Sequence, residues 1–528
     1  TNTYTYGFFL LICEVISFWY WKLVSFFIEP SIEDSLVQNL NKVKTYSEYS
    51  KLAKRLDNLK GNELWKSNPI SKLYDHRLIY DRFLLLQTIA ENLDEGEMMQ
   101  TLRTDLLRNI GGLNDPKLYS YCYFGTKYLI EDYINELATQ FEYVSQAPTE
   151  KIPFQQKLDY FRDTSKTFGQ TALILQGGAS FGIYHIGVAK TLFQEGLLPQ
   201  VISGSEMGAF MAGLVCIHTD EELPNLFMKG GIDLSAFSHS TPEGIVQRRL
   251  LRLIQTGNLM DLTVLQGFVF ENIGDITFQE AYAKTGRILN ITVSSTRKYE
   301  VPQILNYITA PNVLIWSAAC ASSASVGLQD QGELLIKDKN GNIEPWGGVA
   351  IRWLKTSNNM ETNNPHTRLS ELFNVNHFIV SQASPYIIPF MTKGIQLNDD
   401  SLLSRMRSVF YSELKHRVSQ LIYLKLLPSS LRFFVDEKFQ GDITIFPSVN
   451  FKDFKSLFSD PTQGTVEYWM EKGSRSTFPL LELIRNRCKV EFVLNKIYHD
   501  MKTSDPTQNS FVSSYWSQKF FKRTKSIH

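Results

Sequence analysis

Two glycine-rich turns carry the residue types and spacings most suited to chemistry in this sequence. The first reads GGASFG over residues 177–182, and the second reads GSEMG over residues 204–208. Each follows a short apolar run that predicts a buried strand, and each opens a predicted helix. A glycine loop at the start of a helix presents bare backbone N–H groups, which can hold an oxyanion. The first turn is therefore predicted to stabilise negative charge.

The first turn does not match the common nucleotide-binding loops. No Gly-Lys-Ser/Thr follows it, so it is not a Walker loop. Its glycines are spaced G-G-x-x-x-G, which differs from the dinucleotide fingerprint. Gly177, Gly178 and Gly182 are therefore predicted to form an oxyanion hole instead.

The second turn has the spacing of a nucleophile elbow, G-x-S-x-G, with Glu206 where a hydrolase needs serine. The flanking Gly204 and Gly208 fit a strained, crowded turn that pushes the central side chain outward. Attack by a carboxylate on an ester would give an anhydride, and its charge would compete for the oxyanion donors. The sequence thus predicts a self-inhibited site. The neighbouring Ser205 and Met207 belong to the elbow but point elsewhere.

The order of elements around these turns predicts an α/β fold. Strand, glycine loop, helix, strand, turn and helix succeed one another from residue 172 onward, and buried-strand candidates follow at Ile288–Val293 and Phe378–Val380. Apolar spacings of three and four predict helices before and after this core. We predict four regions, which are a hydrophobic anchor (1–30), a helical domain (31–165), an α/β domain that holds both turns (166–390) and a helical C-terminal region (391–528).

Both ends of the sequence carry features suited to a lipid surface. Residues 8–28 hold 17 apolar residues out of 21, yet Glu14 and Lys22 interrupt the run. Charges near the centre of a span are costly, so a helix lying in a lipid surface is favoured over a simple span, with a buried core helix as the alternative. The tail over residues 516–525 is basic and aromatic, which fits either a solvated end or a second lipid anchor.

Composition excludes several classes of protein. The 528 residues are 43% hydrophobic and 20% charged, with 54 basic and 54 acidic side chains. A zero balance argues against a protein-wide nucleic-acid footprint. Five cysteines without a CxxC pair exclude a disulfide scaffold and the common zinc modules. We expect no metal and no cofactor.

The two turns with their flanks resemble the patatin-like lipases, and more narrowly the triacylglycerol lipases of yeast lipid droplets. The resemblance rests on LQGGASFG at 175–182, HIGV at 185–188 and LPQVISG at 198–204, and it extends to about residue 490. It implies a patatin-type α/β core with helical N- and C-terminal regions, ester hydrolysis by a Ser–Asp dyad, and acyl-ester substrates such as triacylglycerol. It also implies a cytosol-facing place on lipid droplets or the endoplasmic reticulum.

The resemblance places the dyad aspartate near Ser357 and Asn358, where neither residue is acidic. Both members of the dyad are thus missing at their expected positions. Asp330 follows a serine-rich stretch and is a reserve candidate for the acid, although an ordinary loop aspartate is the simpler interpretation.

Three other residues suggest weaker possibilities. His76 and Asp81 have the H-x4-D form of some lysophospholipid acyltransferases, but a spacing of five does not put both on one helix face. His185 follows the first turn and is predicted to pack within a helix rather than act as a base. Cys320 is predicted to be a buried small residue.

Three functions remain open on the sequence. The first is a lipid-droplet protein of the triacylglycerol lipase family whose hydrolysis is doubtful because of Glu206. The second is a non-catalytic partner that stabilises or recruits active lipases. The third is acyl transfer to a lysophospholipid through His76 and Asp81. The sequence does not identify a protein partner.

Overall fold

The computed structural model describes most of the chain, namely residues 13–20, 32–92, 94–104, 106–178, 181–237, 262–295, 303–323, 333–346, 353–354, 365–384, 441–449, 461–504 and single positions within 413–453. A mixed seven-stranded sheet lies at its centre, in the order β4-β3-β2-β1-β8-β9 with β7 paired to β3. The strands are β1 (Gln170–Gln176), β2 (Val201–Ser205), β3 (Ile288–Ser295), β4 (Gln303–Leu305), β7 (Trp353–Leu354), β8 (Val375–Gln382) and β9 (Ile443–Ile445). Strands β3, β2, β1, β8 and β9 are parallel, whereas β4 and β7 pair antiparallel with β3.

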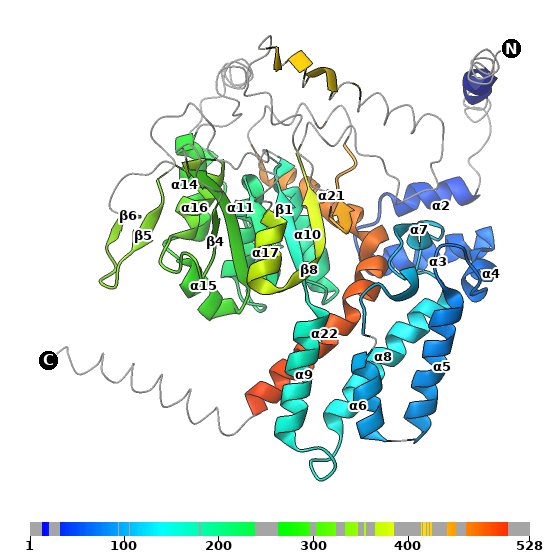
Figure 1. The fold of residues 1–528 in the computed structure, drawn as a ribbon. Coiled ribbons are helices and arrows are strands. Elements are labelled where there is room, and N and C mark those ends of the chain that lie inside the picture. Colours follow the sequence, from blue (N-terminus) through cyan, green and yellow to red (C-terminus); the bar gives the residue numbers. More distant parts are fainter. Residues whose placement is uncertain are drawn as a thin grey trace.

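Helices cover both faces of the sheet (Figure 1). They are α10 (Tyr184–Gln194), α11 (Met207–Ile217), α14 (Leu262–Ile273), α15 (Phe278–Thr285), α16 (Ile315–Ser323), α17 (Pro365–Phe373) and α21 (Gln463–Thr477), with the short α12 (Leu223–Leu226). A small hairpin, β5 (Leu335–Lys337) with β6 (Ile343–Pro345), lies beside them. Parallel strands with helical crossovers confirm the α/β class that the sequence predicts.

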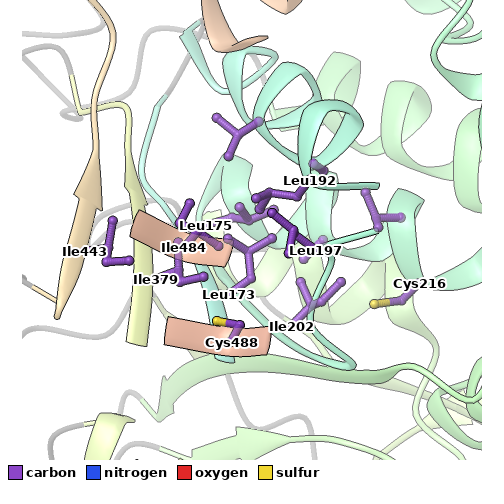
Figure 2. Packing of buried hydrophobic residues seen from close by; sticks show 14 of the residues in the cluster. Leu173, Leu175, Leu192, Leu197, Ile202, Cys216, Ile379, Ile443, Ile484 and Cys488 are labelled. Atoms are coloured by element: carbon purple, nitrogen blue, oxygen red, sulfur yellow. The ribbon is translucent and has the colours of Figure 1, made fainter. Parts of the chain in front are cut away.

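The alternating side chains of β1 divide the core into two layers. Leu173 and Leu175 point to one face, where they pack with Ile379, Ile484 and Cys488 (Figure 2). The neighbouring residues of the strand point to the other face and pack in a smaller cluster that includes Leu369 of α17. A strand buried on both faces reads as a continuous apolar run, which is why β1 was predictable from its sequence.

The N-terminal region is helical and packs on the sheet through one long C-terminal helix. Its helices are α2 (Ile32–Leu40), α3 (Tyr46–Lys60), α4 (Asn62–Ser67), α5 (His76–Asn92), α6 (Glu95–Thr104), α7 (Pro116–Ser120), α8 (Tyr128–Gln146) and α9 (Phe154–Phe168). The long helix, α22 (Leu481–Ser504), contacts α8, α9 and α7. Because α22 also packs under β1, it joins the helical region and the sheet (Figures 1 and 2).

The structure agrees with the strand predictions and shifts one boundary. All four predicted strands occur, as β1, β2, β3 and β8. However, β9 pairs with β8, so the predicted domain end at residue 390 falls between two strands of one sheet. Of the apolar run at 8–28, only residues 13–20 are described, and they form a helix. No described helix is both long and apolar enough to cross a bilayer.

Candidate functional site: an elbow with a glutamate

The second glycine turn folds as a strained strand-to-helix elbow. Glu206 lies between β2 and α11 with φ 56° and ψ −129°. In the described chain, Asn374 is the only other non-glycine residue with a positive φ. A side chain in this region of φ and ψ costs of order 1–3 kcal/mol and persists only where the surroundings impose it. The elbow geometry is therefore present although the serine is not.

The glycines on either side of Glu206 are required by crowding. A Cβ at Gly204 would lie 2.5 Å from Cα of Ala209, and a Cβ at Gly208 would overlap the carbonyl oxygen of Leu175. The elbow therefore packs directly on the backbone of β1, and no larger residue fits at either position. Ser205 is half-buried and Met207 is buried, as expected for residues that flank the outward-pointing position.

The first glycine turn lies beside the elbow at the same edge of the sheet. In the register of β1 and β2, Gln176 stands opposite Ser205, so residues 177 and 206 leave neighbouring parallel strands together. Gly177 and Gly178 have φ of 68° and 117°, which is the left-handed region that favours glycine. A Cβ at Gly178 would come within 2.6 Å of Cα of Gly182. The glycines predicted to form an oxyanion hole thus fold against each other next to Glu206.

His185 is a buried support of the glycine loop. Its ring is fully buried, with Nδ1 2.8 Å from Oγ of Ser381 and Nε2 3.4 Å from the carbonyl oxygen of Gly177. Burial lowers the pKa of His185 to about 4, so the ring is neutral at ordinary pH. In the tautomer that satisfies both contacts, Nε2–H donates to Gly177 and Nδ1 accepts from Ser381. The prediction of a packing histidine agrees with this position.

Two serines that no local sequence signal marks hold the turns. Ser322 of α16 is buried; its Oγ accepts from the N–H of Glu206 at 3.1 Å and donates to the carbonyl oxygen of Thr292 at 2.9 Å. Ser384 packs on Gly177 so closely that a Cβ there would overlap its Oγ. Both serines are distant in sequence from the residue they contact, so only the folded sheet brings them to the site.

The electrostatic field of helix α11 favours a negative charge at the elbow. Glu206 precedes the first turn of α11, an 11-residue helix. The N-terminus of a helix carries a partial positive charge, which stabilises a nearby carboxylate by about 0.3–1 kcal/mol. In a serine hydrolase the same field would act on the oxyanion that develops during attack. In this chain it acts on the side chain that occupies the nucleophile position.

The remaining candidates lie either outside the described residues or in the N-terminal helical region. Asp330, Ser357 and Asn358 lie outside the described residues. His76 is partly exposed and Asp81 exposed at the start of α5, a helix that packs on α8 and α6 in the N-terminal region. Hence the H-x4-D pair and the elbow belong to different parts of the molecule.

Two further predictions concern Cys320 and metal ligands. Cys320 is buried in α16, and burial raises the pKa of its thiol to about 12, so it is a protonated packing residue. Within the described ranges, no group of three or more His, Cys, Asp or Glu side chains is arranged to hold a metal ion.

Comparisons with known proteins agree with this geometry. Residues 173–334 match the family described as patatin-like phospholipase, and residues 29–166 match a domain of unknown function, DUF3336. Triacylglycerol lipase ptl1 of Schizosaccharomyces pombe is 35% identical over 87% of this chain and 84% of its own length. Triacylglycerol lipase ptl3 of the same yeast is 31% identical over 86% and 95%. Triacylglycerol lipase 4 of Saccharomyces cerevisiae is 32% identical over 91% of this chain and 54% of its own length.

An α/β sheet with an elbow and a glycine loop at one edge defines the class as a patatin-type hydrolase fold. The chain belongs to the patatin-like phospholipase family. Within that family, its relatives include yeast proteins named triacylglycerol lipases.

Proposed function

We propose that this chain acts on the surface of lipid droplets as a member of the triacylglycerol lipase family that binds acyl esters without hydrolysing them. The observation that carries the proposal is Glu206 at φ 56°, in the place of the nucleophile. The elbow and the glycine loop keep the shape of an acyl-ester site. The names of the relatives supply the substrate class, which is triacylglycerol.

The chemistry of a carboxylate explains why this site would not turn over. Attack by a carboxylate on an ester must expel an alkoxide to form an anhydride. With water taken as a stand-in for the alcohol, the alcohol has a pKa about 11 units above that of the carboxylic acid. The alkoxide that leaves is therefore a much stronger base than the carboxylate that attacks, a difference that corresponds to roughly 15 kcal/mol against the reaction. The tetrahedral adduct would therefore return to the ester. A second negative charge near the oxyanion donors adds to this barrier.

A second candidate function rests on the same observation. A chain that keeps the elbow shape but lacks the serine can stabilise or recruit active lipases on the same surface. This partner role requires a stable complex with a catalytic relative. Co-purification with no lipase from droplet-bearing cells would contradict it. Acyl transfer through His76 and Asp81 has no comparable support from the site, because α5 lies in the helical region.

The test compares three purified versions on emulsified triacylglycerol, namely the unaltered chain, Glu206→Ala and Glu206→Ser. We expect the unaltered chain and Glu206→Ala to release no fatty acid, while all three versions float with the droplets. Release by Glu206→Ser alone would identify Glu206 as the block and the glycine loop as competent. Ser205→Ala in that serine version is the matched control, and it should leave the release unchanged.

Two results would overturn the proposal. Fatty-acid release by the unaltered chain that Glu206→Ala abolishes would make Glu206 a working catalytic group. An unaltered chain that stays in the soluble fraction, away from the droplets, would contradict the proposed location.

A further inference from the structure

We infer that a corner of the helical N-terminal region, formed by Leu64, Trp65, Ile70, Tyr121 and Tyr128, is a second contact surface for a phospholipid-covered lipid surface. We call these five residues the α4 corner. The inference rests on the proposed function for the presence of a lipid surface. It assigns a role to a part of the chain whose matching family model is a domain of unknown function.

The α4 corner exposes large apolar side chains on two segments, residues 64–70 and 121–128, which the contacts of Trp65 bring together. Leu64 is 79% exposed and Ile70 66%, and Tyr121 and Tyr128 are also exposed. Trp65, which follows Leu64 in the chain, stacks on Tyr121 with ring centroids 4.5 Å apart and planes 19° apart. Single exposed apolar residues are ordinary, whereas a group of this kind marks an interaction surface.

Polar contacts hold the corner in place. The ammonium of Lys127 lies 3.8 Å from the Trp65 ring and donates to the carbonyl oxygens of Trp65 and Asn68 at 2.5 and 2.7 Å. The hydroxyl of Tyr128 donates to Glu63 of α4. The exposed side chains are thus carried by a fixed backbone, so little ordering would be needed for them to enter a lipid surface.

The chemistry of the corner suits an interface between water and hydrocarbon. Leu64 and Ile70 supply aliphatic side chains for the acyl region. Tryptophan and tyrosine favour the level of the headgroups, because each ring is apolar with one polar end. Glu63, which lies beside the corner on α4, pairs with Lys66 at 3.0 Å, and Lys66 also pairs with the buried Asp57.

Local charge adds attraction to anionic phospholipids. Residues 46–82 carry eight Lys or Arg and five Asp or Glu, a local excess of three positive charges in a chain whose formal net charge is zero. The apolar run at 8–28 precedes α2 in the same region. In its described part, a helix at residues 13–20, Ile16 is 63% and Trp19 57% exposed. Stable attachment needs two such signals, since a single one gives only reversible binding.

The experiment measures binding of the full chain to vesicles of phosphatidylcholine with and without 30% phosphatidylserine. The test variant is Leu64→Glu with Ile70→Glu. The matched control is Leu107→Glu with Ile308→Glu, which changes side chains that are 67% and 52% exposed outside the corner. Thermal unfolding of all versions confirms that each remains folded.

We expect the corner variant to bind vesicles at least tenfold more weakly, and the control to bind like the unaltered chain. Lys72→Ala should weaken binding about fivefold to anionic vesicles and not to neutral ones, because one basic residue near such a surface contributes about that factor. Equal binding by the corner variant and the unaltered chain would overturn this inference alone and leave the corner as a protein-binding surface. An unaltered chain that binds no vesicle would overturn both the inference and the proposed lipid-surface function.

Discussion

The two ends of strand β1 are built in opposite ways. At its carboxyl end, Gly177 and Gly178 take positive φ angles, and Glu206 on the adjacent turn is strained. At its amino end, a buried network of charged and polar side chains surrounds Thr171. The carboxyl end presents backbone groups and contains strained residues. At the amino end, the polar groups of Thr171 are hydrogen-bonded, and these contacts fix the position of the strand.

The amino end joins three parts of the molecule. Arg108, from the segment between α6 and α7, forms an ion pair of 3.0 Å with Glu491 of α22, and both side chains are nearly buried. Glu491 also accepts from the backbone N–H of Thr171 at 2.7 Å and from its hydroxyl at 2.5 Å. Arg108 donates to the carbonyl oxygen of Gly169 as well. The helical region, β1 and α22 are therefore connected through one carboxylate.

The comparison indicates that a strained functional edge depends on rigidity elsewhere in the same strand. The elbow packs on the backbone of β1 without space for one methyl group at Gly208. A shift of β1 along its axis would therefore change the elbow directly. The network at the amino end opposes such a shift, because a displaced strand would leave buried charges without partners.

The largest predicted effect comes from a substitution at the amino end of β1, the fixed end of the strand. Glu491→Ala should lower the free energy of unfolding by about 3–5 kcal/mol, because it leaves the Arg108 guanidinium buried without its partner. Urea denaturation measures the change. Glu371→Ala is the matched control, since its ion pair with Arg368 is half-exposed on both sides and is worth about 0–1 kcal/mol.

A double-mutant cycle with Arg108→Ala separates the pair from other effects of the substitution. We expect the two changes to be strongly non-additive, because each removes the same interaction. If Glu491→Ala costs no more than Glu371→Ala, the amino end of β1 is not the fixed end, and the contrast between the two ends fails.

The sequence predicted the strained end better than the fixed end, for a physical reason. Glycine spacing and a flanking apolar run are local signals, so the elbow, the loop and strands such as β1 could be located in advance. The Arg108–Glu491 pair joins residues 383 positions apart, and nothing local marks either one. Ser322 and Ser384 were missed for the same reason. His185 was correctly predicted to be a packing residue, but its contact with Gly177 needed the structure.

The second prediction concerns pH and the histidine under the glycine loop. The pKa of buried His185 is about 4 when folded, against an ordinary value of about 6.5 in the unfolded chain. Between these values the unfolded chain binds the extra proton, so stability is complete above about pH 6.5 and falls as the pH drops toward 4. The loss reaches about 3 kcal/mol at pH 4, at about 1.36 kcal/mol per pH unit.

His185→Gln provides the test, because glutamine keeps a donor and an acceptor but does not titrate. Its free energy of unfolding should be less dependent on pH than that of the unaltered chain by about one proton between pH 6.5 and 4. His377 at the amino end is also buried with a lowered pKa, so part of the slope should remain. An unchanged slope in His185→Gln would show that the glycine end makes no such contribution.

The smallest effect tests whether the elbow is strained without its serine. At φ 56° and ψ −129° an alanine keeps the Cβ that makes the conformation costly, whereas glycine does not. Strain of about 1–3 kcal/mol is partly offset by the extra freedom of glycine in the unfolded chain. Glu206→Gly should therefore be more stable than Glu206→Ala by about 1 kcal/mol in denaturant titrations.

At Ser205, whose backbone is extended, the order should reverse, with glycine less stable than alanine by about 0.5–1 kcal/mol. The same order at both positions would mean that the elbow has relaxed and that its shape no longer needs the fixed end of β1. Opposite orders would mean that the chain maintains the form of a hydrolase elbow at an energetic cost, as expected if that form still binds an acyl ester.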